Sequence, residues 1–204
     1  MYLLRIPSGL RRWLPKGRWE MPVGTQPALY LTFDDGPHPE ITPFVLAQLA
    51  KYEAKGTFFC VGDNVRKYPE VYRQILSEGH RTGNHTFHHL NGWKNKTQEY
   101  LNDAALAKQQ INSPLFRPPY GRIRHAQAKR LAAAGFEVIY WSLLSGDFDI
   151  NLSPQSCLKN VNEKMRPGDI IVFHDSEKAW DRLSFVLPLI LEQATKQGWQ
   201  LKSL

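Results

Sequence analysis

Near its start the chain reads Ala28-Leu29-Tyr30-Leu31-Thr32-Phe33-Asp34-Asp35-Gly36-Pro37, an apolar run that ends in two adjacent carboxylates. The apolar run is typical of a buried strand, and Gly36-Pro37 marks the turn at which this strand ends. Two carboxylates side by side at such a turn are costly unless water, a positive partner or a bound cation stabilises them. The stretch therefore predicts a buried strand with chemically active groups at its carboxyl end.

Short β-like runs alternate with helical ones after residue 27. The predicted strands are 28–33, 57–62, 80–84, 115–117, 136–142, 169–174 and 198–204, and the predicted helices are 41–54, 68–78, 97–111, 123–134, 154–165 and 180–197. This alternation predicts an α/β fold with a parallel sheet. We expect one domain over residues 27–204, preceded by a basic N-terminal extension over residues 1–26.

Polar residues lie at or just beyond the carboxyl ends of five predicted strands: Asp34-Asp35, His85, Arg117, Asp147 and His174. Residues from several strand ends meet most naturally at the mouth of a closed barrel. An open sheet would instead spread them along the edge of a crevice. We therefore predict a barrel of about seven parallel strands that is similar to a TIM barrel.

A second motif, His85-Thr86-Phe87-His88-His89, supplies two imidazoles four residues apart, His85 and His89. They could hold one ion if they fell within a single helical turn. One aspartate and two histidines would leave a divalent metal with open positions for water and substrate, and the second aspartate would be free to act as a base. Such a donor set suits Zn²⁺ first, with Co²⁺, Ni²⁺ and Fe²⁺ as alternatives.

The composition limits the partners of the protein. The chain has 204 residues, of which 42% are hydrophobic, so it can bury a substantial core as a single domain. Its formal net charge is +7, but most basic residues are dispersed along the chain. Net charge alone is a poor argument for nucleic-acid binding, and we expect no nucleic-acid partner.

Basic residues gather only between residues 5 and 19, where they alternate with apolar ones: Arg5, Arg11, Arg12, Lys16 and Arg18. This segment predicts a weak peripheral contact with an anionic membrane surface. The sequence has no unbroken apolar stretch of about 18 residues and no apolar core of a secretory signal. We therefore expect a cytoplasmic protein.

Three further segments complete the pattern: Arg117-Pro118-Pro119-Tyr120-Gly121, Trp141-Ser142-Leu143-Leu144-Ser145-Gly146-Asp147-Phe148 and Ile170-Ile171-Val172-Phe173-His174-Asp175. With the two motifs above, they resemble the polysaccharide deacetylases, the NodB-homology group that is also called carbohydrate esterase family four. The resemblance covers residues 27–204. It implies a distorted (β/α) barrel, zinc or a similar divalent ion, and removal of acetyl groups from polymers of N-acetylated or O-acetylated sugars.

The resemblance also implies a role for each matching residue. Asp34 matches the catalytic base, and Arg117 matches the arginine that pairs with it. His174 matches the general acid, and Asp147 the carboxylate that orients it. The remaining matches are the metal-binding residues and the backbone N–H that binds the oxyanion: Asp35, His85, His89 and Tyr120.

The chemistry of these residue types agrees with the same roles. A bound divalent ion polarises an acetyl carbonyl and lowers the pKa of water toward ~7. Asp34 would take a proton from the attacking water, and the Tyr120 N–H would stabilise the oxyanion. The nitrogen of an amide leaves poorly as an anion, so an acid must protonate it, and His174 beside Asp147 suits that role near neutral pH.

Three residues depart from the family pattern: Leu144 stands in place of an aspartate, Phe148 in place of a tryptophan, and Val172 in place of a leucine. None of them is a proposed metal ligand, base or acid, so we expect activity to remain and specificity to change. The leading hypothesis is a deacetylase of N-acetylated amino sugars in oligo- or polysaccharides, with a monomer as the favoured state. The alternatives are an O-acetyl ester deacetylase, a small-molecule C–N hydrolase, and a carbohydrate- or metal-binding protein with degenerate catalysis.

Overall fold

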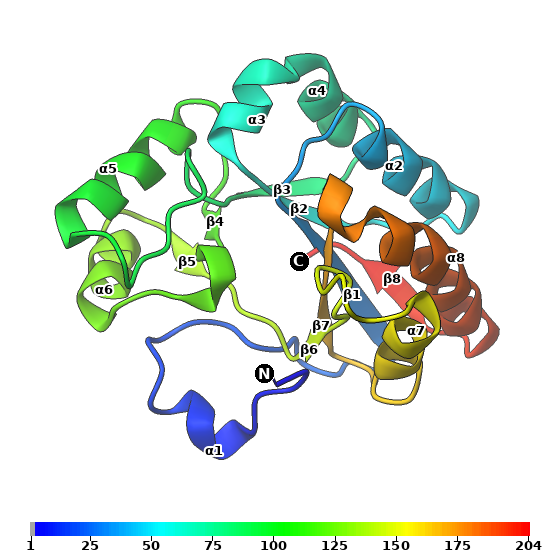
Figure 1. Ribbon diagram of the computed structural model, residues 1–204. Helices are drawn as coiled ribbons and strands as arrows, with labels where there is room; N and C mark the ends of the chain where they lie inside the picture. Colours follow the sequence, from blue (N-terminus) through cyan, green and yellow to red (C-terminus); the bar gives the residue numbers. More distant parts are fainter. Residues whose placement is uncertain (1–2) are drawn as a thin grey trace.

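The computed structural model describes residues 3–204 and contains a parallel sheet bent into a half-barrel (Figure 1). Seven strands run in the order β5-β4-β3-β2-β1-β7-β6, and β8 pairs separately with β1. Every pairing between these strands is parallel, as predicted. The strands are β1 Ala28–Asp34, β2 Thr57–Cys60, β3 Arg81–Asn84, β4 Leu115–Phe116, β5 Glu137–Val138, β6 Leu143–Leu144, β7 Ile170–His174 and β8 Gln200–Lys202.

Helices cover the outer face of the sheet (Figure 1). The main core lies between β1 and β7 on one side and α2 and α8 on the other, where Leu31, Phe33 and Phe173 meet Leu46 and Leu187. The α-helices are α1 Ser8–Arg11, α2 Ile41–Lys51, α3 Gly62–Lys67, α4 Pro69–Ser77, α5 Thr97–Lys108, α6 His125–Ala133, α7 Pro154–Asn162 and α8 Trp180–Lys196, and two 3₁₀ turns are η1 Pro119–Gly121 and η2 Glu177–Ala179. The six predicted helices are present, whereas α1, α3 and both 3₁₀ turns were not predicted.

One strand prediction was wrong. Within residues 136–142 only Glu137–Val138 form a strand, β5 at one edge of the sheet, and β6 at the other edge begins just after this range, at Leu143. The backbone groups between β5 and β6 have other hydrogen-bond partners. The Arg117 guanidinium donates to the carbonyls of Ile139 and Tyr140, and the Tyr140 N–H donates to the Arg18 carbonyl. The two edges therefore lie four residues apart along the chain without pairing in the described part of the structure.

The N-terminal segment lies across this seam. Arg18 bridges to Ile139 next to β5, and Glu20 bridges to Asp169 next to β7. The indole of Trp19 stacks on the ring of Tyr140, with ring centroids 4.1 Å apart. Residues 18–20 thus fill the gap that strand pairing leaves open. In the described part of the chain, no helix has the length and apolar character that crossing a membrane requires.

Candidate metal centre and active-site pocket

The carboxylate of Asp34 faces the interior of the half-barrel and forms a buried ion pair with Arg117. Neighbouring residues of a strand face opposite sides of the sheet, so Phe33 enters the outer core while Thr32 and Asp34 face inward. Arg117 Nη1 donates to Asp34 Oδ1 at 2.7 Å and to Thr32 Oγ1 at 2.6 Å. Burial lowers the pKa of Arg117, and the Asp34 charge opposes that shift.

The turn after β1 places Asp35 beside Asp34 with its side chain in a different direction. Asp35 has a left-handed backbone with φ of 82°, which is uncommon outside glycine and concentrates at functional sites. The Gly36 N–H donates to Asp175 Oδ1 at 3.1 Å, and a Cβ on Gly36 would lie only 2.1 Å from the same carboxylate. Burial raises the pKa of Asp175 to about 7, and Thr42 Oγ1 donates to its other oxygen. No catalytic role was predicted for Asp175.

Residues 85–89, the histidine motif, form a loop. The sequence had suggested that His85 and His89 would bind one ion if they lay within a single helical turn, and this turn is not formed. Thr86 and His89 have positive φ values of 61° and 55°. Asp103 of α5 holds the loop, because its carboxylate accepts hydrogen bonds from the backbone N–H groups of Phe87 and His88, at 2.8 and 2.9 Å, and from the His88 ring. A loop brings His85 and His89 to one side because the left-handed residues reverse the chain between them.

Asp35, His85 and His89 offer donor atoms that all lie within 4.8 Å of one another, so they could hold one metal ion. His89 Nε2 is 3.2 Å from Asp35 Oδ1, and His85 Nε2 is 3.8 Å from the same oxygen. The His85 Nδ1–H donates to the Arg117 carbonyl at 2.7 Å, which leaves Nε2 as the free nitrogen. A backbone carbonyl on the second nitrogen is the usual way in which a metal-binding imidazole is oriented.

The protonation states of these groups fit a cation. Burial lowers the pKa of His85 to about 4, against the opposing charges of Asp34 and Asp35, so this imidazole is neutral at pH 7. Burial alone would raise the pKa of Asp35, but the hydrogen bond from His89 and the charges of His174 and His85 hold it well below its usual range. A neutral imidazole and an ionised carboxylate are the forms that bind a metal.

A second charged pair, His174 and Asp147, lies in the same pocket. The Nδ1 of His174 is 2.8 Å from Asp147 Oδ1, and its backbone N–H donates to Asp147 Oδ2 at 2.7 Å. Burial would lower the pKa of His174, but the charge and hydrogen bond of Asp147 outweigh it and raise the pKa to about 9. The ring of Phe148 packs edge-on against His174 at 5.2 Å. This imidazole is therefore a cation at neutral pH.

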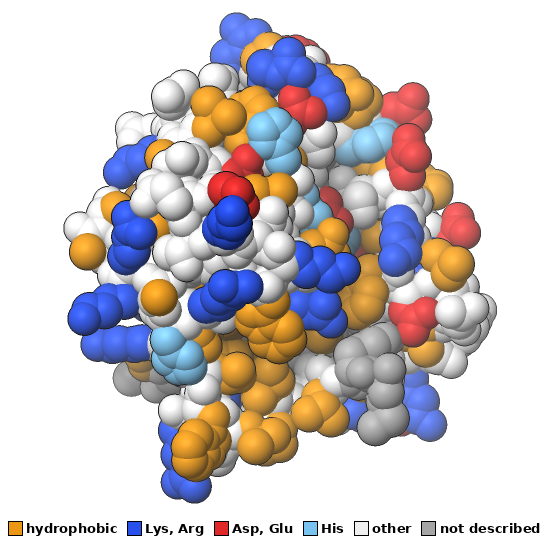
Figure 2. Space-filling view, turned by 60° about the vertical axis from the view of Figure 1, so that its left-hand side comes forward, with side chains coloured by type: hydrophobic (Ala, Val, Ile, Leu, Met, Phe, Trp, Pro, Cys, Tyr) orange, Lys and Arg blue, Asp and Glu red, His pale blue; other side chains and the backbone are white. Residues whose placement is uncertain are grey.

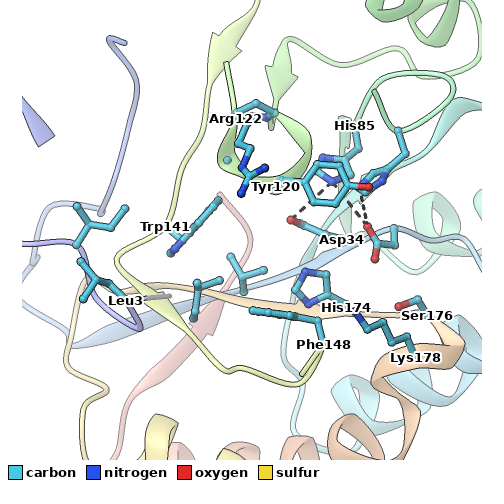
Figure 3. Close-up of a pocket in the computed structure, with 17 residues that line it drawn as sticks. Leu3, Asp34, His85, Tyr120, Arg122, Trp141, Phe148, His174, Ser176 and Lys178 are labelled. Atoms are coloured by element: carbon cyan, nitrogen blue, oxygen red, sulfur yellow. Dashed lines mark ion pairs between the residues drawn. The ribbon is translucent and has the colours of Figure 1, made fainter. Parts of the chain in front are cut away.

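These groups share one pocket of about 640 Å³ (Figure 3). Tyr120, in η1, has a positive φ of 61°, and its ring lies 4.7 Å from that of His89. Gly121 allows the Trp141 ring to approach, since a Cβ there would lie 2.5 Å from that ring. Figure 2 shows the hollow in this face, with histidine and acidic side chains inside it and Lys and Arg around it.

The structure brings the sequence-predicted residues together. Arg117 and Asp147 lie behind the pocket as partners of Asp34 and His174. The other six line the pocket: Asp34, Asp35, His85, His89, Tyr120 and His174. Asp103, which holds the histidine loop, was not predicted from the sequence. Five further residues that line the pocket were also not predicted: Leu3, Ile6, Arg122, Ser176 and Lys178. Leu3 and Ile6 are distant in sequence from every motif, and no local signal marks them.

Comparisons with known proteins agree with this geometry. A family model described as polysaccharide deacetylase matches residues 23–139. A peptidoglycan-N-acetylglucosamine deacetylase from Bacillus cereus is 35% identical over 89% of this chain and 88% of its own length. A chitooligosaccharide deacetylase from Azorhizobium caulinodans is 32% identical over 74% of each chain. The crystal structure of a peptidoglycan N-acetylglucosamine deacetylase with a bound N-oxidanyl-benzamide superposes with a TM-score of 0.87 at 29% identity, and covers 98% of this chain and 95% of that chain.

Proposed function

Because the chain belongs to the polysaccharide deacetylase family, we propose that it removes acetyl groups from N-acetylated amino sugars in oligo- or polysaccharides as a metal-dependent hydrolase. The relatives named above are deacetylases of peptidoglycan and of chitooligosaccharides. One observation carries the proposal: a buried carboxylate–arginine pair and a histidine cation flank the same Asp-His-His cluster in one pocket. That arrangement supplies a base, an acid and a metal site for one hydrolysis.

We propose that Asp35, His85 and His89 hold a divalent metal, with Zn²⁺ as the preferred ion. The donor set of one carboxylate and two imidazoles suits zinc and related first-row ions, and it leaves positions open. When bound, such an ion polarises the acyl carbonyl and makes water more acidic. The proton transfers and the binding of the oxyanion are carried out by the protein groups around the metal-binding residues.

Asp34 has the geometry of a general base. Its Oδ1 accepts from Arg117, whereas Oδ2 faces the metal-binding residues, 4.0 Å from His85 Nε2. Oδ2 is therefore the oxygen that takes a proton from the attacking water as that water adds to the carbonyl carbon. Arg117 fixes the carboxylate and favours its ionised form.

His174 has the charge of a general acid. Asp147 occupies its Nδ1, so the proton to be donated is at Nε2. As the C–N bond breaks, the sugar nitrogen takes this proton, and the products are a free amine and acetate. We propose the backbone N–H of Tyr120 as the oxyanion donor, because the left-handed turn at Tyr120 lies on the pocket wall beside His89.

An O-acetyl ester is the closest alternative substrate, and the charge of His174 favours the amide. An alcohol leaves an ester readily, whereas an amine needs the proton. Acetate release from N-acetyl and O-acetyl oligosaccharides by zinc-loaded protein, with and without chelator, tests the proposal. We expect His174→Ala to lower amide cleavage by a factor of about 10²–10⁴ and to retain much of the ester cleavage.

Two other outcomes of this assay would contradict the proposed function. Release of acetate from neither class, by protein that has bound zinc, would favour a carbohydrate- or metal-binding protein without catalysis. Cleavage of a small cyclic or linear amide in the absence of any oligosaccharide cleavage would favour a small-molecule C–N hydrolase. We propose a monomer as the working state.

A further inference from the structure

The pocket continues from the metal-binding residues into an apolar compartment, which we define by five lining residues: Leu3, Ile6, Trp141, Leu144 and Val172. Leu3 lies at the far end from Asp34 and His85, and Trp141 lies between them (Figure 3). The polar lining residues Ser176 and Lys178 lie on the opposite side of the pocket, beyond His174. The pocket therefore has a polar end and a largely apolar end, with the reacting groups between them. Arg122 also lines the pocket and lies beside Trp141 in Figure 3.

The outer wall of this compartment is a built part of the fold. Arg5 binds Asp169 through two hydrogen bonds, Nη1 to Oδ1 at 2.8 Å and Nη2 to Oδ2 at 2.7 Å. Asp169 is 1% exposed and also accepts a hydrogen bond from Ser142 Oγ at 2.6 Å. The Leu144 N–H donates to the Leu4 carbonyl at 2.8 Å. These bonds fix the segment Leu3–Ile6 against β6 and the start of β7.

Two residues of the compartment are departures noted in the sequence. Leu144 places an alkyl side chain in the pocket where an aspartate would have placed a charge, and Val172 has a smaller side chain than leucine. Both are almost fully buried, at 8% and 1% exposure, whereas Leu3 is still 51% exposed. An apolar occupant would cover the exposed part of Leu3 without burying a charged group.

The chemistry of the walls selects the occupant. The several hydroxyl groups of a sugar ring need hydrogen-bond partners when they leave water, and the aliphatic side chains of the compartment provide none. Its one side-chain donor is the indole N–H of Trp141, which has no partner among the described residues. An alkyl chain gains roughly fourfold in affinity for each methylene that it buries. An acyl chain attached to the reacting carbonyl begins beside the metal-binding residues, so it can extend into the compartment without displacing the sugar.

We propose that the compartment binds the acyl chain of N-acyl amino sugars with chains longer than acetyl, and that the segment Leu3–Ile6 determines this specificity. The inference rests on the proposed deacylase function. The reaction is unchanged: water adds to the carbonyl carbon, the C–N bond breaks, and a longer carboxylate leaves in place of acetate. The sugar ring occupies the polar end of the pocket near Ser176 and Lys178.

The test measures the activity of the zinc-loaded protein on glucosamine tetramers that carry N-acetyl or N-hexanoyl groups, with the free amine measured by mass spectrometry. We expect the kcat/KM for hexanoyl to equal or exceed that for acetyl, because several methylenes are buried. Leu144→Asp and Leu3→Asp should each lower the hexanoyl-to-acetyl ratio by about tenfold or more. Arg5→Ala, which releases the wall without touching the compartment, should lower the ratio mainly through KM.

Leu10→Ala is the matched control, because Leu10 is an exposed leucine of the same N-terminal segment outside the pocket. It should leave the ratio unchanged. Acetate release with hexanoyl cleavage about a hundredfold weaker would overturn the inference and keep the proposed function. A ratio that neither Leu144→Asp nor Leu3→Asp alters would also overturn it. Cleavage of neither tetramer would instead count against the proposed function itself.

Discussion

Asp34 and Asp35 are neighbours in the chain, yet their carboxylates have different partners. Asp34 is paired with the Arg117 guanidinium, whereas Asp35 faces His85 and His89. The left-handed backbone at Asp35 ends the strand geometry and lets its carboxylate enter the same pocket as that of Asp34. In a regular strand the two side chains would face opposite sides of the sheet, whereas here both carboxylates line one pocket, so we propose a separate role for each.

Replacement of Arg117 with leucine should strongly destabilise the protein. Asp34 is only 4% exposed and would lose its charged partner in a buried position. Breaking a buried pair by removing one member costs about 3–5 kcal/mol. Urea denaturation would measure the loss, with the exposed Arg130→Leu as a control that should change the unfolding free energy by about 0.5 kcal/mol or less. Equal stability of the two variants would contradict the importance of the Arg117–Asp34 pair.

His174 should titrate far above an ordinary histidine. Burial alone would lower the pKa of His174, but Asp147 outweighs burial and raises the pKa to about 9, above the ordinary histidine pKa of about 6.5. NMR titration of the metal-free protein should show this, and in Asp147→Asn the pKa of His174 should fall, because burial is then opposed only by the smaller effects of Asp35 and Asp34. If the pKa of His174 stayed near 9 in the Asp147→Asn variant, the Asp147 carboxylate could not be the cause of the raised pKa.

The same shift has a consequence for stability. Since the folded pKa of His174 exceeds the unfolded one, the ion pair contributes fully below about pH 6.5 and is lost as the pH rises through about 9. The stability difference between wild type and Asp147→Asn should therefore narrow from pH 6 to pH 10. A difference that stays constant over this range would contradict the assignment.

At the scale of elements, the site is built from turns that follow the strands. Among the residues 3–204, five non-glycine residues have a positive φ, and four of them lie at or beside the site: Asp35, Thr86, His89 and Tyr120. Such conformations cost free energy and persist only where surrounding contacts impose them. Asp103, on α5, makes those contacts for the histidine loop.

Asp103→Ala should weaken metal binding although Asp103 is no ligand. Loss of its three hydrogen bonds frees the loop between His85 and His89, and loss of such outer support typically lowers metal affinity about 10–100-fold. Zinc competition with a chromophoric chelator would measure the change. Asn102→Ala, an exposed neighbour on α5, should have no effect, and equal zinc affinity in both variants would show that the loop is held by other contacts.

Sequence patterns could predict the strands that end in a motif, because an apolar run followed by polar residues marks the carboxyl end of a buried strand. Sequence patterns gave wrong predictions where contacts with residues distant in the chain determine the backbone conformation. The run 136–142 has the composition of one strand, but Arg117 and Arg18 take its central backbone groups. Likewise, the His85 and His89 spacing suggested a helical turn, whereas the backbone at Thr86 and the anchor at Asp103 impose a loop.

At the scale of the whole molecule, the N-terminal segment joins the two edges of the half-barrel and reaches the pocket. Its role could not be predicted from the sequence, because its main partners are far away in the chain: Arg5 pairs with Asp169, and Arg18 with Glu137. Most basic residues in such a segment are exposed. No local sequence pattern distinguishes them from an arginine such as Arg5, whose partner Asp169 is buried. The eight proposed site residues, by contrast, lie in motifs of recognisable order.

Any membrane contact is confined to a small part of this segment. Arg5, Arg11 and Arg18 have carboxylate partners within the protein, whereas no ion pair of Arg12 or Lys16 is found in residues 3–204. Beside them, Leu10 and Trp13 are 51% and 72% exposed. We predict weak binding to anionic vesicles, measured by sedimentation.

Each cation near an anionic surface contributes about 1 kcal/mol, so Arg12→Gln should weaken vesicle binding about fivefold. The exposed Phe185→Ala, on α8, should leave it unchanged. Indifference of the wild-type protein to these vesicles at low salt would contradict the prediction.

The most direct test of the central claim is acetate release from N-acetylglucosamine oligomers by zinc-loaded wild type and Asp34→Asn, with bound zinc measured in the same samples. Asp34 is not among the proposed metal ligands, so both proteins should bind zinc equally. The wild type should release acetate, and the variant should be slower by a factor of about 10²–10⁴, the usual contribution of a general base. Asp181→Asn, an exposed acid at the start of α8, should behave as wild type. Equal rates for wild type and Asp34→Asn, or no acetate from zinc-loaded wild type, would contradict a deacetylase with Asp34 as its base.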